Sequence, residues 1–281
     1  MFHGNVVVIT GAGSGIGRAL GLELARRGAR LALCDVNDDG LAETERLVRE
    51  SIAGAQVYSR HLDVTDRSAF AAYAETVVAY YGVVHQIYNN AGIAGFGTIA
   101  DAPWEVFERV IGVDLWGVIN GTKLFLPYLI ASGDGHVINV SSLYGLMAQG
   151  ENGPYCAAKF GVRGFTETLR LELTKSGAPV KVTVVHPGGV KTNVANATLM
   201  LGEELGRPAT DDDRRLLRLY NDKLLRMDPG EAANIILDAV DDGAPRVLVG
   251  NDAKLGDLLV RLFPKGYARA VVALERLFAR L

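Results

Sequence analysis

The sequence predicts an α/β protein whose core is a doubly wound parallel sheet with helices on both faces. Short apolar runs alternate with stretches of helical periodicity, and glycine or polar residues follow the ends of those runs. With 281 residues, 49% of them apolar, the chain can bury one large core. We expect a single domain over residues 1–251 and a helical extension over residues 252–281.

Composition narrows the class of function. The formal net charge is -3, which gives no reason to expect nucleic acid as a partner. Cys34 and Cys156 lie in apolar contexts without metal-ligand spacing, so we interpret them as reduced core thiols and expect no metal site. The N-terminus lacks a basic region followed by an apolar run, and no apolar stretch reaches about 18 residues. The sequence therefore predicts a cytoplasmic protein.

The first element is an apolar strand over residues 6–9, followed by the glycine-rich stretch 10–17 and a helical pattern. This order of strand, turn and helix is the context in which glycines bind a dinucleotide. Gly11 and Gly15 allow tight turning close to a pyrophosphate, and Gly17 lets the helix pack on the strand. The positive end of the helix favours the phosphates.

The second strand, residues 29–34, ends in Asp35, eighteen residues after Gly17. A carboxylate there can accept hydrogen bonds from the adenosine ribose and would repel a 2′-phosphate. Ser14, which we place with Ile16 among the cofactor-binding residues, is uncharged, and Arg18 is the nearby cation. The balance favours NAD over NADP, with Arg18 as the residue that would receive a 2′-phosphate in the alternative.

The pattern repeats along the chain. Helices are expected over residues 38–51 and 67–81, and strands over residues 56–62 and 84–88. Ligands gather at the carboxyl ends of such strands. The polar residues that follow these strands are Asp35, Asp63 and Asn89-Asn90-Ala91-Gly92.

Tyr155 and Lys159 stand four residues apart, so on a helix they share one face. An ammonium within about 4 to 6 Å lowers the pKa of a phenol by about 1 to 3 units, which suits Tyr155 to general acid-base work. Ser142, thirteen residues before Tyr155, offers a hydroxyl that could hold the same substrate oxygen.

These motifs, in this order and spacing, resemble the short-chain dehydrogenase/reductase family, whose single domain has a Rossmann-like fold. The resemblance spans residues 10 to 192 and rests on Thr10-Gly11-x-x-x-Gly15-x-Gly17, Asp63, Asn89-Asn90-Ala91-Gly92, Ser142, Tyr155-x-x-x-Lys159 and Pro187-Gly188-Gly189-Val190-Lys191-Thr192.

The resemblance implies a role for each matching residue. Tyr155 would exchange the proton, Ser142 would orient the substrate oxygen, and Lys159 would also bind the nicotinamide ribose. Asp63 and Val64 would contact the adenine. The remaining cofactor-binding residues are Asn90, Ala91 and Gly92, which would support the cofactor, and Pro187, Gly188, Val190 and Thr192 around the nicotinamide.

One position departs from the family pattern. Asp114 stands where the family usually has an asparagine that supports a proton relay behind the lysine. We keep Asp114 as a catalytic residue, because its main-chain carbonyl remains and its carboxylate would favour the ammonium of Lys159. Its helix, expected over residues 103–130, is apolar nearly all round, which is typical of a helix buried by the sheet and by another chain. The resemblance implies a homodimer or homotetramer.

Beyond the catalytic motifs the pattern loosens. Residues from about 193 to 227 suit a lid over the site. The substrate wall is expected to be apolar, which indicates a lipophilic alcohol or ketone; its residues are Ile93, Phe96, Leu143, Tyr144 and Met147.

The family architecture ends with a helix over residues 229–240 and a strand over residues 246–250. In the extension that follows, six Lys or Arg residues outnumber three Asp or Glu residues. Basic amphipathic helices can lie on anionic membranes, but more often they pack on their own core or on a neighbouring subunit. We favour packing over membrane binding.

The sequence thus predicts an oxidoreductase that transfers a hydride between NAD(H) and a lipophilic secondary alcohol or ketone, with Tyr155 as general acid-base. Two alternatives remain: an NADP-linked carbonyl reductase, and a dinucleotide-binding regulatory protein without turnover. The departure at Asp114 favours the second alternative, and the intact Ser142, Tyr155 and Lys159 oppose it.

Overall fold

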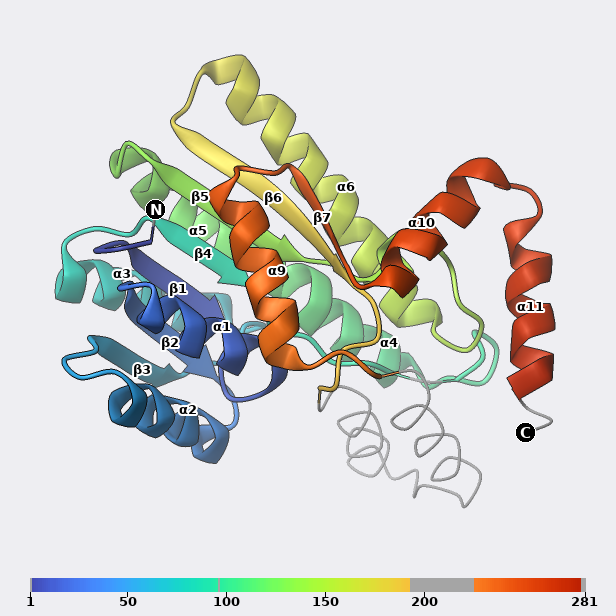
Figure 1. Ribbon diagram of the computed structural model, residues 1–281, viewed down its shortest axis with the longest axis horizontal. Helices are drawn as coiled ribbons and strands as arrows, with labels where there is room; N and C mark the ends of the chain where they lie inside the picture. The colour runs from blue at the N-terminus through green and yellow to red at the C-terminus, as the bar shows by residue number, and fades with distance from the viewer. Residues whose placement is uncertain (1, 96, 193–224, 279–281) are drawn as a thin grey trace.

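The computed structural model describes residues 2–95, 97–192 and 225–278, with side chains up to residue 273. Its centre is a parallel sheet with the strand order β3-β2-β1-β4-β5-β6-β7 (Figure 1). The strands are β1 (Val6–Thr10), β2 (Arg30–Asp35), β3 (Val57–His61), β4 (Gln86–Asn89), β5 (Gly135–Val140), β6 (Val180–Pro187) and β7 (Arg246–Val249).

Helices cover both faces of the sheet, which confirms the predicted doubly wound architecture (Figure 1). One face carries α1 (Gly15–Arg26), α2 (Asp38–Ser51) and α9 (Pro229–Asp241). The other carries α3 (Arg67–Tyr81), α4 (Trp104–Ile111), the π-helical turn η1 (Gly112–Trp116), α5 (Gly117–Ala131) and α6 (Gly153–Ser176). After β7 come α10 (Asn251–Leu262) and α11 (Tyr267–Phe278).

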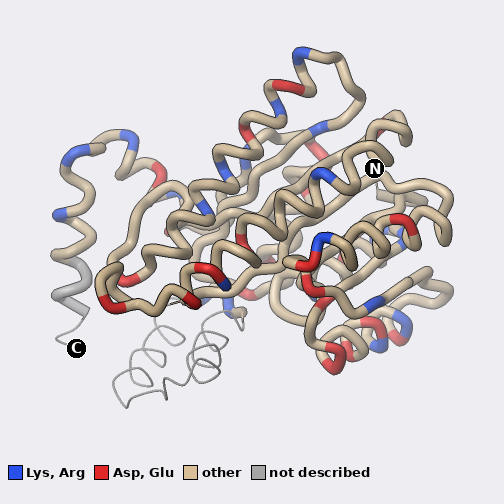
Figure 2. Tube along the Cα trace, turned by 180° about the vertical axis from the view of Figure 1, so that it is seen from behind, with Lys and Arg blue, Asp and Glu red and all other residues tan. Residues whose placement is uncertain are grey.

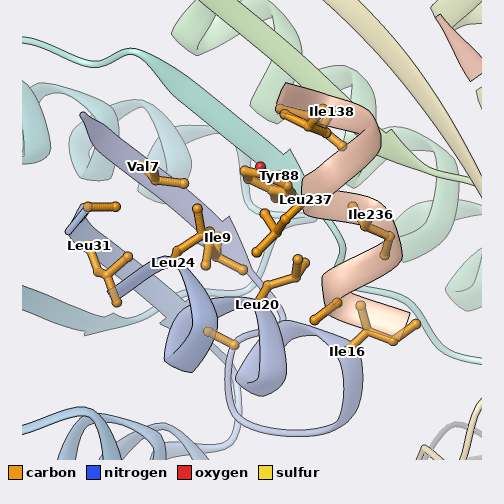
Figure 3. Packing of buried hydrophobic residues seen from close by; sticks show 14 of the residues in the cluster. Val7, Ile9, Ile16, Leu20, Leu24, Leu31, Tyr88, Ile138, Ile236 and Leu237 are labelled. Atoms are coloured by element: carbon orange, nitrogen blue, oxygen red, sulfur yellow. The ribbon is translucent and has the colours of Figure 1, made fainter. Parts of the chain in front are cut away.

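Successive residues of a strand point to opposite faces, and this alternation divides the core in two. Val7 and Ile9 of β1 pack under α1 and α9, whereas Val6 and Val8 pack under α3 and α5. Figure 3 shows the first of these layers, in which Leu20 of α1 meets the strands and α9.

The chain order places a crossover between β1 and β4, because β2 and β3 lie on one side of β1 and the later strands on the other. Ligands of such sheets bind at the carboxyl ends of the strands, where the direction of winding reverses. The glycine loop after β1 and Asn90 after β4 lie at this point.

The predicted helices over residues 38–51 and 67–81 are confirmed to the residue, and the capping side chains Asn37 and Asp66 account for their starts. Two elements differ from expectation. Strand β5 was not predicted, and the single helix expected over residues 103–130 is interrupted by the π turn η1.

Two further expectations concern a lid over the site and the absence of a membrane-spanning helix. The predicted lid falls almost wholly on residues 193–224, outside the described residues. In the part of the chain that the structure describes, no helix has the length and apolar character needed to cross a membrane. The division of the chain after residue 251 stays a prediction.

Candidate active site

The turn between β1 and α1 needs glycine at several positions. Gly11 has a φ of +66°, and a Cβ there would lie 2.7 Å from the Cα of Ala91. A Cβ on Gly17 would overlap the carbonyl oxygen of Gly11, which brings α1 as close to β1 as the backbone allows. The glycines predicted from sequence are therefore required by the packing.

The first turn of α1 is open to an anion. Ser14 occupies the N-cap in an extended conformation, but its side chain makes no capping hydrogen bond. The first N–H groups of a helix have no partner within the helix, so those of α1 can bind a pyrophosphate. This uncapped terminus beside the glycine turn fits a nicotinamide dinucleotide.

Asp35 lies at the end of β2 against the glycine loop. Its Oδ2 accepts a hydrogen bond from the N–H of Gly13 at 2.7 Å, and its Oδ1 accepts one from Asn37 at 2.9 Å. These contacts fix the orientation of the carboxylate that is predicted to bind the adenosine ribose. Arg18 is held behind the loop, where it donates to Thr44 at 2.9 Å and to the carbonyl oxygens of Gly13 and Gly40.

Residues after β4 tie that strand to the glycine loop. The hydroxyl of Thr10 accepts hydrogen bonds from the N–H groups of Asn90 and Ala91, both at 3.0 Å. The amide of Asn90 donates in return to the carbonyl oxygens of Thr10 and Gly11. Asn90 therefore ties the end of β4 to the glycine loop, and its role toward a cofactor stays a prediction.

Asp63 and Val64 follow β3 along the chain. Hydrogen bonds from Thr65 and the charge of Arg109, 3.3 Å away, outweigh the effect of burial and hold the pKa of Asp63 below its ordinary value. Val64 is buried, and its carbonyl oxygen accepts a hydrogen bond from Asn120 at 3.0 Å. Arg109 was not predicted, because it lies 46 residues from Asp63 and belongs to no motif.

Tyr155 and Lys159 occupy the first two turns of α6, whose start is favoured by Pro154. The ammonium of Lys159 lies 5.5 Å from the centre of the Tyr155 ring. Ser142 comes directly before the short 3-10 turn η2 (Leu143–Gly145), and its hydroxyl is hydrogen-bonded to the phenol of Tyr155. The three predicted residues thus meet at one point.

Lys159 is held from two sides. Its ammonium donates to the carbonyl oxygen of Val140 at 3.1 Å and pairs with Oδ2 of Asp114 at 3.0 Å. The other oxygen of Asp114 accepts a hydrogen bond from the N–H of Ile93 at 2.8 Å. Gly92 leaves the necessary space, since a Cβ there would lie 3.1 Å from the Asp114 carboxylate.

The charges of this pair support each other. Burial lowers the pKa of Lys159, but the charges of Asp114 and Tyr155 and the hydrogen bond to Asp114 together outweigh it, so the net direction is upward. Burial raises the pKa of Asp114, and the charge of Lys159 opposes that rise without cancelling it. Asp114 sits within η1, and π turns of this kind occur often at functional sites.

The net pKa shift of Tyr155 is opposite to the lowering expected from sequence. Burial raises the pKa of the phenol, and the carboxylate of Asp114 adds to the rise. The ammonium of Lys159 and the hydrogen bond from Ser142 lower it, as predicted, but do not outweigh burial. The phenol is therefore held in its protonated form.

Residues 187–192, which the resemblance expects around the nicotinamide, begin at the end of β6 and face α1. Gly15 and Thr192 are in contact, since a Cβ on Gly15 would lie 2.9 Å from the methyl carbon of Thr192. Val190 is buried in the core, and Gly188 donates a hydrogen bond to the carbonyl oxygen of Val249 at 2.9 Å. Pro187 ends β6, so the motif lies at the same carboxyl edge as the glycine loop.

The predicted apolar wall is in part visible. Ile93 and Tyr155 pack against Val106 and Val110 of α4. Leu143, Tyr144 and Met147 are half-buried beside Ser142, and the Tyr144 and Tyr155 rings meet edge to face at 6.3 Å. Phe96 lies outside the described residues.

Two hydrogen bonds near Ser142 were not predicted. The hydroxyl of Ser141 donates to the carbonyl oxygen of Lys159 at 2.8 Å, and Nδ1 of His186 is 2.8 Å from the carbonyl oxygen of Ser142. Burial lowers the pKa of His186 to about 4, so the ring is neutral and Nδ1 carries the donated proton. Neither residue has a sequence pattern that distinguishes it from a core residue.

The short chain dehydrogenase family model matches residues 5–200 of the chain. The putative oxidoreductase SadH of Mycobacterium tuberculosis is 52% identical over 273 residues, which is 97% of this chain and 95% of SadH. The C alpha-dehydrogenase of a Sphingobium strain is 33% identical over 86% of this chain and 79% of its own length.

Solved structures agree. A short-chain dehydrogenase/reductase from Burkholderia phymatum, in complex with NAD, has a TM-score of 0.84 at 29% identity and covers 94% of this chain and 95% of its own. An alcohol dehydrogenase from Thermococcus sibiricus, complexed with 5-hydroxy-NADP, has a TM-score of 0.71 at 26% identity over 86% and 93% of the two chains. The chain belongs to the short-chain dehydrogenase/reductase family.

Proposed function

We propose that the chain transfers a hydride between NAD(H) and a lipophilic secondary alcohol or ketone. The observation that carries this proposal is the meeting of Ser142, Tyr155 and Lys159 at the carboxyl edge of the sheet, beside a glycine loop suited to a dinucleotide. Family membership establishes an oxidoreductase that binds a nicotinamide dinucleotide. The choice of NAD and the substrate class are our proposals.

Tyr155, Ser142 and Lys159 each have a separate role in the proposed proton transfer. The nicotinamide supplies the hydride acceptor or donor for the carbinol carbon. In its deprotonated form Tyr155 takes the hydroxyl proton as the alcohol becomes a ketone, and as a phenol it returns that proton in the opposite direction. Ser142 donates a hydrogen bond to the substrate oxygen, and Lys159 stabilises the phenolate form of Tyr155.

Asp35 and Arg18 support the preference for NAD. The carboxylate of Asp35 is fixed beside the glycine loop, where it would accept ribose hydroxyl hydrogen bonds and repel a 2′-phosphate. Arg18 would have to leave Thr44 and two carbonyl oxygens to reach such a phosphate. Binding of NADP would therefore break hydrogen bonds of Arg18 that binding of NAD leaves in place.

Exposed apolar residues support a homodimer or homotetramer. Trp116 is the last residue of η1 and Phe160 lies on α6, and the two side chains are 49% and 40% exposed. We propose that they are covered by a second copy. We also propose a cytoplasmic location, with residues 252–281 as an extension that packs on the protein rather than on lipid.

The test is NADH formation with NAD and secondary alcohols graded by size and apolarity. We expect Tyr155→Phe to abolish turnover and Tyr80→Phe, which removes the hydroxyl of an exposed tyrosine on α3, to leave it unchanged. Rates that rise with chain length would support the apolar pocket. Binding of NAD without turnover of any alcohol or ketone would support the regulatory alternative, and a higher kcat/KM with NADP would contradict the cofactor choice.

A further inference from the structure

The first residues after β7 hold the loop over residues 188–191, which is part of the motif expected around the nicotinamide. The N–H of Gly189 donates to Oδ2 of Asp252 at 2.6 Å, although Asp252 lies 63 residues later in the chain. The neighbouring N–H groups of Gly188 and Lys191 donate to the carbonyl oxygens of Val249 and Met227, both at 2.9 Å. These three N–H groups therefore each have an acceptor, and Asp252 is the one acceptor of the three that belongs to a side chain.

The fit around Asp252 is tight. Gly188 has no side chain, and a Cβ there would overlap the Asp252 carboxylate. Oδ1 of Asp252 accepts the N–H of Ala253 at 2.9 Å, so both carboxylate oxygens are used. Gly250, with a φ of +101°, makes the turn that brings Asp252 back over the loop. A single exposed carboxylate therefore ties α10 to the motif that carries Val190 and Thr192.

The same helix touches the other half of the site. Ala253 and Gly256 form the buried side of α10. A Cβ on Gly256 would lie 2.5 Å from a methyl carbon of Leu143, the residue that follows Ser142. Figure 1 shows α10 alongside the end of β7, and α10 packs on both β7 and η2.

Charges fix α10 in this place. Asp257 pairs with Arg246 of β7 at 3.9 Å and with Arg261 of its own helix at 2.7 Å. Arg246 also pairs with Glu167 of α6 at 2.5 Å. The helix is therefore linked both to the sheet and to the helix that carries Tyr155 and Lys159.

We propose that α10 positions both halves of the active site. Asp252 sets the loop that holds the nicotinamide, and the contact of Gly256 with Leu143 sets the turn that carries Ser142. The inference rests on the proposed function, and it gives the start of the extension a role that no motif of residues 10 to 192 supplies. Asp252 and Gly256 are positioning residues, because they act through Gly189 and Leu143.

The first experiment replaces Asp252 with asparagine in the full chain. An asparagine offers one neutral acceptor oxygen where two charged ones are used, so one of the two N–H groups loses its acceptor and the other keeps only a neutral one. We expect about tenfold weaker NADH binding by fluorescence titration, and a KM for NAD raised by a similar factor with the KM for the alcohol unchanged. Asp242→Asn removes an exposed carboxylate at the end of α9 and serves as the control for charge.

The second experiment replaces Gly256 with alanine. The new methyl group displaces Leu143, and we expect the KM for the alcohol to rise at least about fivefold while NADH binding stays unchanged. The double variant Gly256→Ala/Leu143→Ala should have the same KM for the alcohol as Leu143→Ala alone, because the shorter side chain at position 143 leaves room for the new methyl group. Gly266→Ala is the control, since the nearest atoms to its Cβ lie at 3.9 Å.

The possible outcomes distinguish a failure of the proposed function from a failure of the positioning role of α10. If the unsubstituted chain binds neither NADH nor NADPH and turns over no alcohol or ketone, the proposed function fails and the inference fails with it. If that chain is active but Asp252→Asn binds NADH as Asp242→Asn does, the inference is wrong and the function stands. A lower melting temperature in either positioning variant with unchanged KM values would show a structural role alone and would also overturn it.

Discussion

Replacing Lys159 with methionine tests how the buried ion pair is balanced. The ammonium lies 3.0 Å from the carboxylate of Asp114, and the two side chains are 4% and 0% exposed. Methionine removes the charge and keeps much of the length. Asp114 would then keep the hydrogen bond that it accepts from the N–H of Ile93.

The cost follows from the uncompensated charge. Breaking a buried pair by removing one partner destabilises a protein by about 3–5 kcal/mol. Burial already raises the pKa of Asp114 above its ordinary value, and losing Lys159 raises it further. A carboxyl whose folded-state pKa is raised carries no charge penalty below its unfolded pKa, and the penalty grows as pH rises toward and through the folded value. The loss of stability must therefore be larger at pH 8 than at pH 5.

Urea unfolding of the variant at pH 5 and pH 8 measures both quantities. Lys175→Met, on the exposed last turn of the same helix, is the matched control and should cost little at either pH. The double variant Asp114→Asn/Lys159→Met should recover much of the loss at pH 8, because no buried charge remains. The reasoning is refuted if Lys159→Met costs the same at both pH values, or if the double variant is no more stable than the single one.

Three further predictions concern charge and cofactor. Asp114→Asn should lower the apparent pKa for alcohol oxidation, because the carboxylate of Asp114 raises the pKa of Tyr155; a pH profile of kcat/KM that stays in place or moves upward would contradict this. Asp35→Ser should raise the NADP to NAD ratio of kcat/KM at least about tenfold, and an unchanged ratio would argue against the ribose site. His136 and His186 are buried with pKa values of about 4, below about 6.5 in the unfolded chain, so each should cost about 1.4 kcal/mol per pH unit as pH falls from about 6.5 to 4; urea unfolding that is flat over this range would contradict it.

The sequence predicted most of what local pattern determines. The glycine turn, the helices over residues 38–51 and 67–81 and the four-residue spacing of Tyr155 and Lys159 each depend on a short stretch of the chain. Strand β5 was missed because polar residues His136 and Asn139 interrupt its apolar run. Both are buried, and Asn139 is satisfied by hydrogen bonds with Asn89 and Thr166, residues far away in sequence.

Other features depend on contacts that no local pattern reveals. The helix around Asp114 is apolar nearly all round, so its residue pattern does not mark the position of the π turn. The direction of the pKa shift of Tyr155 depends on burial, which periodicity does not measure for a residue lining a site. Asp252 reaches Gly189 across 63 residues, and its own surroundings in the sequence mark only the start of a helix.

Asp114 has opposite effects on the two catalytic residues beside it. It raises the pKa of Lys159 and so keeps the ammonium charged, but its own charge also raises the pKa of Tyr155. An asparagine could accept the hydrogen bond from Ile93 without either electrostatic effect. In this chain the carboxylate therefore secures the cation at the expense of phenolate formation. The phenol is protonated before substrate binds, which suits donation to a ketone; alcohol oxidation must first remove that proton, so its rate should continue to rise at pH values where reduction already declines.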